Sequence, residues 1–289
     1  MLYSIANALH LAEKELPHVD NPSREAGIML QYVLEVNRSY ILSFSERKLS
    51  DIEATKFFDY VYKRSQGIPL AYILGEKEFY SLKFKVNENT LIPRPETELL
   101  VDLVLDHENI LSNDFKIEVP KDAAVLDLGC GSGAIAISIA KHREAWKVYA
   151  TDISNEALFI AKDNARLNKT DNVRFIQSNW YAHVPNIKFD LIVSNPPYIA
   201  NNSEDIEKYV KMYEPSSALF SEEDGLADLK AIIFQSASHL KAGGLLLLEH
   251  GYNQELEVKA LLLDAGFKTI KSFLDLSGLI RVCVGQLTE

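Results

Sequence analysis

The sequence predicts an α/β fold, with helices on both faces of a mostly parallel sheet, and a helical region in front of it. Three observations lead to this prediction. From residue 123 onward, short apolar segments alternate with longer helical segments, as they do where parallel strands are joined by crossover helices. The first of these apolar segments runs into a glycine-rich turn. Before residue 75, apolar residues recur at the spacing of amphipathic helices instead.

Residues 1–75 carry the patterns of several helices and are predicted to form one domain. Asn21-Pro22 places an N-cap residue before a proline at the first helical position. Ser50-Asp51-Ile52-Glu53 has the capping-box pattern in front of another apolar stripe. The first helix is expected to have an apolar face formed by Leu2, Ile5, Leu9, Ala12 and Leu16. This part carries no recognisable set of catalytic residues, so we expect a small helical bundle that serves to dock a partner.

Residues 76–92 change period and are predicted to form a short hairpin or an extended linker. A second domain, residues 93–289, then begins with Pro93-Arg94-Pro95-Glu96-Thr97-Glu98. This segment opens a helix, because Pro95 suits a first turn and the acidic residues complement the helix dipole. A well-capped helix start does not explain Arg94, which stands between two prolines.

The remaining elements follow from the alternation of apolar and helical segments. Strands are expected at residues 123–128, 147–151, 173–177, 189–194, 244–249, 268–274 and 280–284. Helices are expected at residues 133–142, 154–168, 225–241 and 253–265. The polar segment 199–219 has no clear periodicity, and we interpret it as an active-site loop or lid.

Composition excludes several classes of protein. Asp and Glu outnumber Lys and Arg by 41 to 30, and a net charge of −11 argues against a non-specific nucleic-acid binder. The two cysteines, Cys130 and Cys283, show neither metal-ligand spacing nor a disulfide framework. The apolar runs are too short to span a bilayer, and the start of the sequence is unlike a secretory signal. We therefore expect a cytoplasmic protein with no metal site, no direct nucleic-acid contact and no membrane segment.

A cofactor site is predicted where the first strand enters the glycine-rich turn. Gly129, Gly131 and Ala134 satisfy the relaxed dinucleotide pattern G-x-G-x-x-G/A, which by itself is only moderately specific. Asp152 ends the second strand, 23 residues after Gly129, where a carboxylate can bind two ribose hydroxyls. The alternative for Asp152 is a helix N-cap in front of Ser154.

A second site is predicted at Asn195-Pro196-Pro197-Tyr198, directly after the apolar strand 189–194. Two prolines make this turn rigid, and the carboxyl edge of a parallel sheet is where ligands bind. The side-chain oxygen of Asn195 and the carbonyl of Pro196 could accept two N–H hydrogens from a planar nitrogen, and Tyr198 could stack on its plane. Such an element suits a carboxamide or an exocyclic amine. The alternative is an ordinary turn with a packing tyrosine.

Asp127-Leu128-Gly129-x-Gly131-x-Gly133 resembles the first motif of class I methyltransferases that use S-adenosylmethionine. The resemblance implies a Rossmann-like, mostly parallel seven-stranded sheet. It also implies that Asp152 binds the ribose and that Ser178-Asn179-Trp180 flanks the adenine. Asn179 is an amide where the class often has an acidic residue, so recognition of adenine N6 is expected to differ from the usual pattern. The residues that would approach the methionine part are Gly129, Cys130, Gly131, Ser132 and Gly133.

Over nearly its whole length the chain is similar to the bacterial release-factor glutamine methyltransferases, the HemK/PrmC family. The similarity includes the N-terminal helical domain, the glycine loop and a C-terminal strand that begins at Arg281. The other segments that carry it are residues 67–75, 92–98, 195–198, 213–215 and 248–251. The resemblance implies methyl transfer from S-adenosylmethionine to the side-chain N5 of the glutamine in the Gly-Gly-Gln motif of peptide chain release factors 1 and 2. It implies that Asn195, Pro196, Pro197 and Tyr198 bind this glutamine, that Asn195 also neighbours the cofactor, and that Arg94 contributes to substrate binding. S-adenosylhomocysteine would be the product, and the enzyme is expected to be a monomer.

Four alternatives remain open on the residues alone. A ribosomal-protein glutamine methyltransferase shares the Asn195–Tyr198 tetrapeptide, but the Arg94 segment and the helical first domain favour release factors. An adenine-N6 DNA methyltransferase is disfavoured by the net charge of −11 and the short chain. A non-catalytic adaptor that only binds the cofactor would not need the polar tetrapeptide. A nucleotide-linked oxidoreductase fits the motifs least well.

Overall fold

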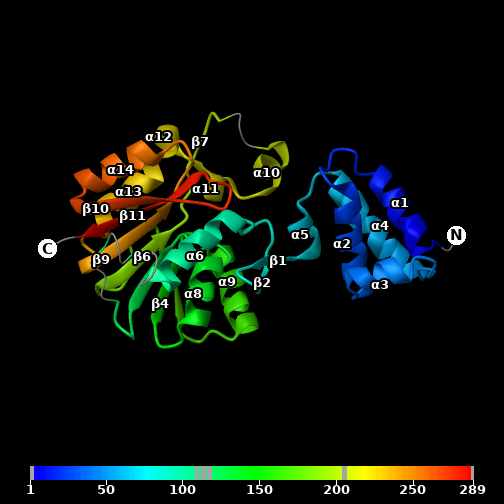
Figure 1. The fold of residues 1–289 in the computed structure, drawn as a ribbon, viewed down its shortest axis with the longest axis horizontal. Coiled ribbons are helices and arrows are strands. Elements are labelled where there is room, and N and C mark those ends of the chain that lie inside the picture. The colour runs from blue at the N-terminus through cyan, green and yellow to red at the C-terminus, as the bar shows by residue number, and fades with distance from the viewer. Residues whose placement is uncertain (1–2, 108–110, 112–114, 116–118, 204–206, 288–289) are drawn as a thin grey trace. The chain divides into compact units, whose positions relative to one another are not determined.

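The computed structural model describes all residues except 1–2, 108–110, 112–114, 116–118, 204–206 and 288–289. The chain forms two compact units (Figure 1). One unit comprises Met1–Gly75 together with Glu207–Tyr213, and the other comprises Glu76–Ile206 and Glu214–Glu289. No helix among the described residues is both long enough and apolar enough to cross a membrane.

The first unit is a helical bundle, as its apolar spacing predicts. Its helices are α1 (Ile5–Lys14), α2 (Pro22–Leu34), α3 (Arg38–Ser43), α4 (Asp51–Ser65) and α5 (Leu70–Leu74). The predicted capping box is present at the start of α4, because the Ser50 hydroxyl accepts from Glu53 N and the Glu53 carboxylate accepts from Ser50 N. Phe57, Met29 and Leu30 are fully buried in the centre of the bundle. The bundle therefore has its own hydrophobic core.

A short helix from the middle of the sequence completes this unit. Helix α10 (Lys208–Tyr213) lies inside the segment interpreted as a lid, yet it belongs to the N-terminal unit. The Tyr213 hydroxyl donates to Gln66 O at 2.9 Å, and the Tyr209 ring lies 5.7 Å from that of His18. The lid interpretation is therefore incomplete. Sequence periodicity could not reveal this pairing, because it joins segments about 150 residues apart.

The second unit is built on a twisted sheet, in which seven strands are found among the described residues. The strands are β3 (Ala124–Leu128), β4 (Lys147–Asp152), β5 (Val173–Gln177), β6 (Phe189–Ser194), β9 (Leu240–Glu249), β10 (Phe267–Leu274) and β11 (Ile280–Leu287). Their spatial order is β10-β11-β9-β6-β3-β4-β5. The central pairings are parallel, and β11 runs antiparallel to both of its neighbours. The mostly parallel sheet predicted from the sequence is confirmed.

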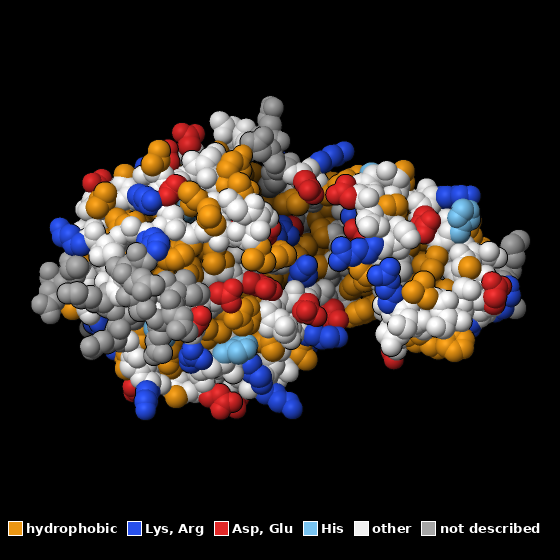
Figure 2. Space-filling view, viewed as in Figure 1, with side chains coloured by type: hydrophobic (Ala, Val, Ile, Leu, Met, Phe, Trp, Pro, Cys, Tyr) orange, Lys and Arg blue, Asp and Glu red, His pale blue; other side chains and the backbone are white. Residues whose placement is uncertain are grey.

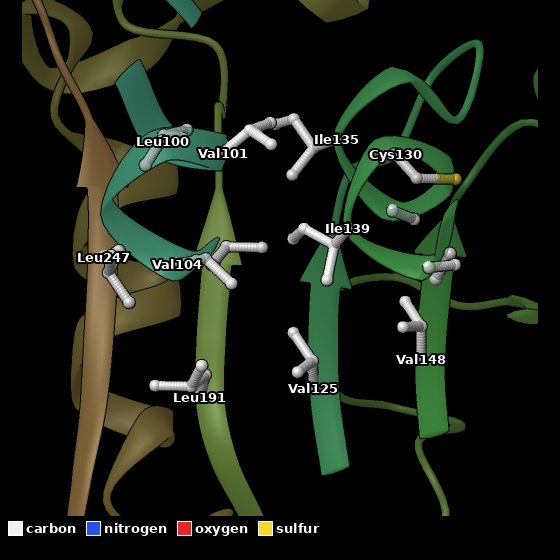
Figure 3. Packing of buried hydrophobic residues seen from close by; sticks show 14 of the residues in the cluster. Leu100, Val101, Val104, Val125, Cys130, Ile135, Ile139, Val148, Leu191 and Leu247 are labelled. Carbon is white, nitrogen blue, oxygen red and sulfur yellow. The ribbon is translucent and has the colours of Figure 1, made fainter. Parts of the chain in front are cut away.

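Helices cover both faces of this sheet (Figure 1). On one face lie α6 (Glu98–Leu105), α8 (Ala134–His142) and α9 (Asn155–Asn168). On the other lie α13 (Ala227–Ser236) and α14 (Glu255–Asp264). Figure 3 shows Val104 of α6 and Ile139 of α8 directed towards Val125, Leu191 and Leu247 of the strands beneath them. Strands buried on both faces account for the continuous apolar runs in the sequence.

The boundary between α13 and β9 differs from the prediction of a helix to residue 241 and a strand from residue 244. The helix ends at Ser236 and the strand begins at Leu240. Leu240 pairs with Phe189 of β6, and Gln286 donates to Gly243 O at 2.9 Å. Pairing with neighbouring strands thus extends β9 through residues whose local sequence does not indicate a strand. Strand β11 likewise continues to Leu287, three residues beyond its predicted end at residue 284.

Smaller elements complete the second unit. The predicted hairpin is formed by β1 (Glu76–Phe79) and β2 (Leu82–Lys85). A 3-10 turn η1 (Pro95–Thr97) leads into α6, so the helix start predicted at Pro95 is confirmed. The polar segment after β6 contains β7 (Ile199–Ala200), α11 (Ser216–Leu219), β8 (Phe220–Ser221) and α12 (Glu222–Gly225). Strands β7 and β8 pair in parallel.

One buried asparagine joins the hairpin to the rest of the second unit. Asn164 of α9 is completely buried. Its amide nitrogen donates to Lys85 O at 3.0 Å and to Ser132 O at 2.9 Å, and its oxygen accepts from Lys85 N at 2.7 Å. The side chain thereby connects β2, α9 and the end of the glycine-rich turn.

Replacing Asn164 by alanine is expected to lower the free energy of unfolding by about 2–4 kcal/mol. The reason is that three backbone groups lose their partner, a buried one at Ser132 and two partly buried ones at Lys85. Urea denaturation followed by circular dichroism measures the change. Asn155→Ala at the exposed start of the same helix is the control, with an expected change of about 0.5 kcal/mol or less. Equal effects of the two substitutions would contradict the role assigned to Asn164.

Candidate active site

The site lies where the strand order reverses. From β3 the chain moves outward through β4 to β5, and then returns to β6 on the other side of β3. Such a switch point opens a crevice at the carboxyl ends of the two strands, which is the usual ligand site of open α/β sheets. The Ser194 hydroxyl, at the end of β6, donates to Leu128 O, at the end of β3, at 2.7 Å. This bond holds together the two strand ends from which the predicted sites begin.

A pocket of about 410 Å³ occupies this crevice. Eight of the residues predicted for the two sites line it: Gly129, Gly131, Asp152, Ser178, Asn179, Trp180, Asn195 and Pro197. Six others do not line it: Cys130, Ser132, Gly133, Pro196, Tyr198 and Arg94. The cofactor motif and the polar tetrapeptide, predicted separately, thus meet in one cavity. Its volume falls in the range of small-molecule sites.

Asp152 organises the glycine-rich turn. One carboxylate oxygen accepts from Gly131 N at 2.8 Å and the other accepts from Ser154 N at 2.9 Å. The N-cap of α9 is Ser154, whose hydroxyl accepts from Ala157 N. The alternative interpretation of Asp152 as the N-cap is therefore wrong. Burial raises the pKa of Asp152 above its usual value, while the bonds from backbone N–H groups oppose that rise.

Trp180 lies against the first glycine of the turn. A Cβ at Gly129 would approach Trp180 Cζ3 to 3.3 Å, and Gly129 has a φ of +71°. Both the close approach and the left-handed backbone favour glycine at this position. Trp180 itself has a φ of +46°, which is uncommon for a side chain of its size. The indole therefore forms one wall of the pocket beside the turn.

Cys130, Ser132 and Gly133 face the protein interior. The Cys130 thiol is buried in the hydrophobic core, and burial raises its pKa well above the usual value. Cys130 N donates to Thr151 O at 2.8 Å, which ties the turn to β4. A Cβ at Gly133 would come within 2.8 Å of Ile137 and 3.2 Å of Ala161. Packing therefore accounts for the residue types at positions 130 and 133. A cofactor contact of Cys130, Ser132 or Gly133 stays a prediction.

The side chain of Asn195 is held in one orientation. Its amide nitrogen donates to Thr97 Oγ1 at 3.0 Å, and the Thr97 hydroxyl donates to Glu249 Oε2 at 2.7 Å. The other carboxylate oxygen of Glu249 accepts from the Tyr198 hydroxyl at 3.1 Å. Within the described part of the chain, no group donates to Asn195 Oδ1, and Asn195 lines the pocket. The tetrapeptide is thereby connected to η1 and to the end of β9.

The backbone of the tetrapeptide is held as well. Gln254, which precedes α14, donates from its amide to Tyr198 O at 3.0 Å and accepts from Gly251 N at 2.9 Å. A Cβ at Gly225 would lie 2.2 Å from Tyr198 O, so only glycine allows this approach. Burial, followed by the nearby Glu249 carboxylate, raises the pKa of Tyr198, which keeps the phenol protonated.

Arg94 lies outside the pocket in an ion pair with a buried carboxylate. Its guanidinium donates to Glu214 Oε1 at 2.5 Å, and Glu214 Oε2 accepts from Ile92 N at 3.0 Å. The Glu214 side chain is 1% exposed and that of Arg94 is 33% exposed. The pair anchors the segment in front of η1 to the start of the segment that carries α11. Substrate binding by Arg94 stays a prediction.

Several site residues carry no signal that marks them individually. Thr97 and Glu249 lie within two of the segments on which the family resemblance depends, but neither is assigned a role there. Glu249, which follows the apolar run Leu245–Leu248 directly, is an acidic residue where a buried strand ends. The other pocket residues without a prediction are Asn89, Thr90, Leu91, Ile153, Ser154, Ala157, Pro215, Ser217, Ala218, Phe220 and Asp228. Those at 215–220 fall within the segment interpreted as a lid.

The pocket suits S-adenosylmethionine. A carboxylate at the end of the second strand, Asp152, can accept from two ribose hydroxyls. Trp180 and Ile153 offer apolar surface for a flat purine. An added Cβ at Gly131 would meet no atom within 4 Å, so the turn leaves open space above its backbone.

Two family models match the chain. The model described as "Methyltransferase small domain" matches residues 108–226, and the model described as "PrmC N-terminal domain" matches residues 7–75. Solved structures support the fold. The catalytic domain of hMettl16 superposes with a TM-score of 0.54 at 17% identity, covering 84% of this chain and 86% of that one. A methyltransferase from Pyrococcus furiosus gives a TM-score of 0.53 at 19% identity, covering 74% of this chain and 92% of that one.

Curated relatives are similar over nearly the full length. The release factor glutamine methyltransferase of Buchnera aphidicola subsp. Schizaphis graminum is 42% identical, covering 96% of this chain and 97% of the relative. The proteins of the same name from Salmonella typhimurium and Shewanella oneidensis are 39% and 38% identical, covering 97% and 95% of this chain and 98% and 91% of the relatives. With this identity over both domains, the chain belongs to the family of release factor glutamine methyltransferases.

Proposed function

We propose that this protein transfers a methyl group from S-adenosylmethionine to the side-chain N5 of the glutamine in the Gly-Gly-Gln motif of peptide chain release factors 1 and 2. The observation that carries the proposal is the orientation of Asn195. Its amide nitrogen donates to Thr97, so the carboxamide oxygen is left to accept a hydrogen bond from a substrate N–H group. The relatives at 38–42% identity bear the name of this activity.

Binding of the acceptor amide falls to the tetrapeptide. Asn195 Oδ1 and the carbonyl of Pro196 accept the two hydrogens of the glutamine nitrogen, and the ring of Tyr198 lies along the plane of the amide. These contacts hold the nitrogen in line with the methyl carbon, and alignment of this kind can lower a barrier by up to about 7–11 kcal/mol. They also favour the positive charge that develops on the nitrogen.

The methyl transfer does not require a strong base. When bound, S-adenosylmethionine supplies a methyl group activated by its positively charged sulfur. The new N–C bond forms as the S–C bond breaks, and S-adenosylhomocysteine is released. The amide nitrogen loses one proton, and this proton can depart after attack because alkylation has made it more acidic. The residues of this chain therefore need to orient the nitrogen rather than deprotonate it in advance.

Cofactor binding is assigned to the other residues predicted for the site. Asp152 accepts from the two ribose hydroxyls, and Asn179 and Trp180 border the adenine. The backbone of the glycine-rich turn at Gly129 and Gly131 borders the methionine part. Asn195 lines the same pocket as these cofactor residues, so one residue can contact both the cofactor and the acceptor.

The charge of the protein surface does not favour a DNA substrate. The net charge is −11, and on the face shown in Figure 2 Lys and Arg side chains are interspersed with Asp and Glu. Neutralising a phosphate backbone takes a concentrated basic surface.

The test uses S-adenosylmethionine with a labelled methyl group. The protein is incubated with release factor, with ribosomal protein or with adenine-containing DNA, and the modified residue is mapped by mass spectrometry. Label on the glutamine of the Gly-Gly-Gln motif is the expected result. Label in DNA or ribosomal protein but not in release factor would overturn the proposal, and bound cofactor without transfer to any substrate would indicate an adaptor.

The helical unit is assigned to docking of the release factor. It has a core of its own, and none of the residues that line the pocket belongs to it. Deleting residues 1–75 is therefore expected to raise the KM for release factor at least about tenfold, while the Kd for S-adenosylmethionine changes less than about twofold. Steady-state kinetics and calorimetry measure the two constants, and circular dichroism checks that the truncated protein is folded. An unaltered KM for release factor would exclude a docking role.

A further inference from the structure

Behind the tetrapeptide lies a buried chain of hydrogen bonds. It runs from the Asn195 amide nitrogen to Thr97 Oγ1, from the Thr97 hydroxyl to Glu249, and from the Tyr198 hydroxyl to the same carboxylate. Glu249 is 1% exposed and Thr97 is 4% exposed. Three segments distant in sequence, η1, the turn after β6 and the end of β9, therefore meet at one carboxylate. Neither Glu249 nor Thr97 lines the pocket.

When Glu249 is ionised, the direction of each bond in this chain is determined. An ionised carboxylate has no hydrogen to donate, so Thr97 and Tyr198 must both donate to Glu249. The single hydroxyl hydrogen of Thr97 is thereby committed, and only a lone pair is left for Asn195. Asn195 must present its NH₂ group to Thr97 and its oxygen to the pocket. The carboxylate thus determines the polarity of the amide that faces the substrate.

The opposite orientation would be unproductive. If the Asn195 amide were rotated, its NH₂ group would face the NH₂ group of the acceptor glutamine, and two donors would oppose each other. A neutral side chain at position 249 permits this rotation. A glutamine there can donate to Thr97 Oγ1, which frees the Thr97 hydroxyl to donate to the Asn195 oxygen.

The surroundings of Glu249 place the pKa of its carboxyl group close to neutral pH. Burial raises the pKa of Glu249 to about 7. The hydrogen bonds from Thr97 and Tyr198 and the positive charge of Arg281 on β11 lower this pKa and so oppose the rise. The negative charge of Glu96 in η1 raises the pKa of Glu249 further. Arg281 also pairs with Asp275 at 3.4 Å, which divides its charge between two carboxylates. The deprotonated form of Glu249, which sets the chain, therefore becomes populated as the pH rises through about 7.

We propose that Thr97 and Glu249 are positioning residues for methyl transfer, which act by fixing the carboxamide of Asn195 with its oxygen towards the acceptor nitrogen. This inference rests on the proposed function for its kinetic consequences, but the orientation itself is a property of the protein without substrate. Thr97 and Glu249 touch neither cofactor nor acceptor in this scheme.

The kinetic test compares four variants of the full chain. Glu249→Gln and Thr97→Val are expected to lower kcat for release factor by about 10- to 100-fold, with KM and the Kd for S-adenosylmethionine within about twofold of the wild type. Thr97→Ser, which keeps the hydroxyl, is expected to recover most of the kcat lost in Thr97→Val. Ser236→Ala is the matched control, because it removes a buried hydroxyl that donates to Ile233 O within α13, away from the pocket.

The pH profile gives a readout that a purely structural role would not change. In the wild type, kcat should rise as the pH passes through about 7, because Glu249 loses its proton there. In Glu249→Gln this rise should be absent. A kcat of Glu249→Gln and Thr97→Val within twofold of the wild type would overturn the proposal, and so would an equal loss in Thr97→Val and Thr97→Ser.

A measurement without substrate separates this inference from the proposed function. The side-chain NH₂ resonances of Asn195, assigned by their loss in Asn195→Ala, report the bond to Thr97 in the ¹⁵N-labelled protein. Hydrogen exchange of these protons is expected to be at least about tenfold faster in Thr97→Val and Glu249→Gln than in the wild type, whatever acceptor is methylated. Unchanged exchange in both variants would disprove the orienting role even if release factor is the substrate.

Discussion

Asn195→Ala is expected to lower kcat for release-factor methylation by about 10²–10³-fold, comparable to removal of one preorganised transition-state contact. The substitution removes the acceptor oxygen at the pocket and the donor to Thr97 together. Steady-state kinetics with a saturating concentration of S-adenosylmethionine measure the loss. The KM for release factor should change far less than kcat, because most of the contact with a protein substrate lies outside the tetrapeptide.

The loss must not come from unfolding. Asn195 is only partly buried, so Asn195→Ala should keep the cooperative thermal transition of the wild type. Asn201→Ala, six residues further along in an exposed turn, is the matched control and is expected to retain full turnover. A variant at position 195 with near-normal kcat would contradict the proposed grip on the acceptor amide.

Asp152→Ala is expected to weaken binding of S-adenosylmethionine about 100-fold. Two hydrogen bonds from ribose hydroxyls to a charged group contribute about 3 kcal/mol or more together, and 1.4 kcal/mol corresponds to a factor of ten in affinity. The substitution also releases Gly131 N and Ser154 N, which the carboxylate holds at 2.8 and 2.9 Å. Isothermal titration calorimetry with the cofactor alone measures the Kd.

Asp152→Asn separates these two contributions. The amide oxygen can still accept from one backbone N–H group, but the charge towards the ribose is lost, so an intermediate Kd is expected. Because the pKa of Asp152 is raised, wild-type affinity should start to fall at a higher pH than for an ordinary aspartate as the solution is acidified. Asp171→Ala, at an exposed position, is the control and is expected to bind the cofactor with wild-type affinity. Wild-type affinity of Asp152→Ala as well would refute the ribose role.

The parts of the site that could be predicted are those that depend on a short stretch of chain. Gly129, Gly131 and Asp152 follow the ends of their strands, and Asn195 follows the end of β6, so strand pattern and motif suffice to place them at one edge of the sheet. Their common pocket confirms that placement. Helices of the N-terminal bundle such as α4 were equally predictable, because a capping box is a local feature.

The parts that could not be predicted depend on contacts between distant segments. Residues of η1 and β9 reach the tetrapeptide over separations of 98 residues for Thr97 to Asn195 and 152 residues for Thr97 to Glu249. The pairing of Leu240 with Phe189 and the packing of α10 with the N-terminal unit have the same origin. No periodicity within a window of sequence carries such information.

The amino-acid sequence by itself determined the fold class, the order of strands and helices, the glycine-rich turn and the rigid polar tetrapeptide. These follow from local backbone preferences and from the spacing of apolar side chains, which act over a few residues. Only the tertiary structure decided which atom of Asn195 faces the pocket. That choice depends on one hydroxyl and one buried carboxylate whose hydrogen-bonding directions are fixed only when three remote segments come into contact.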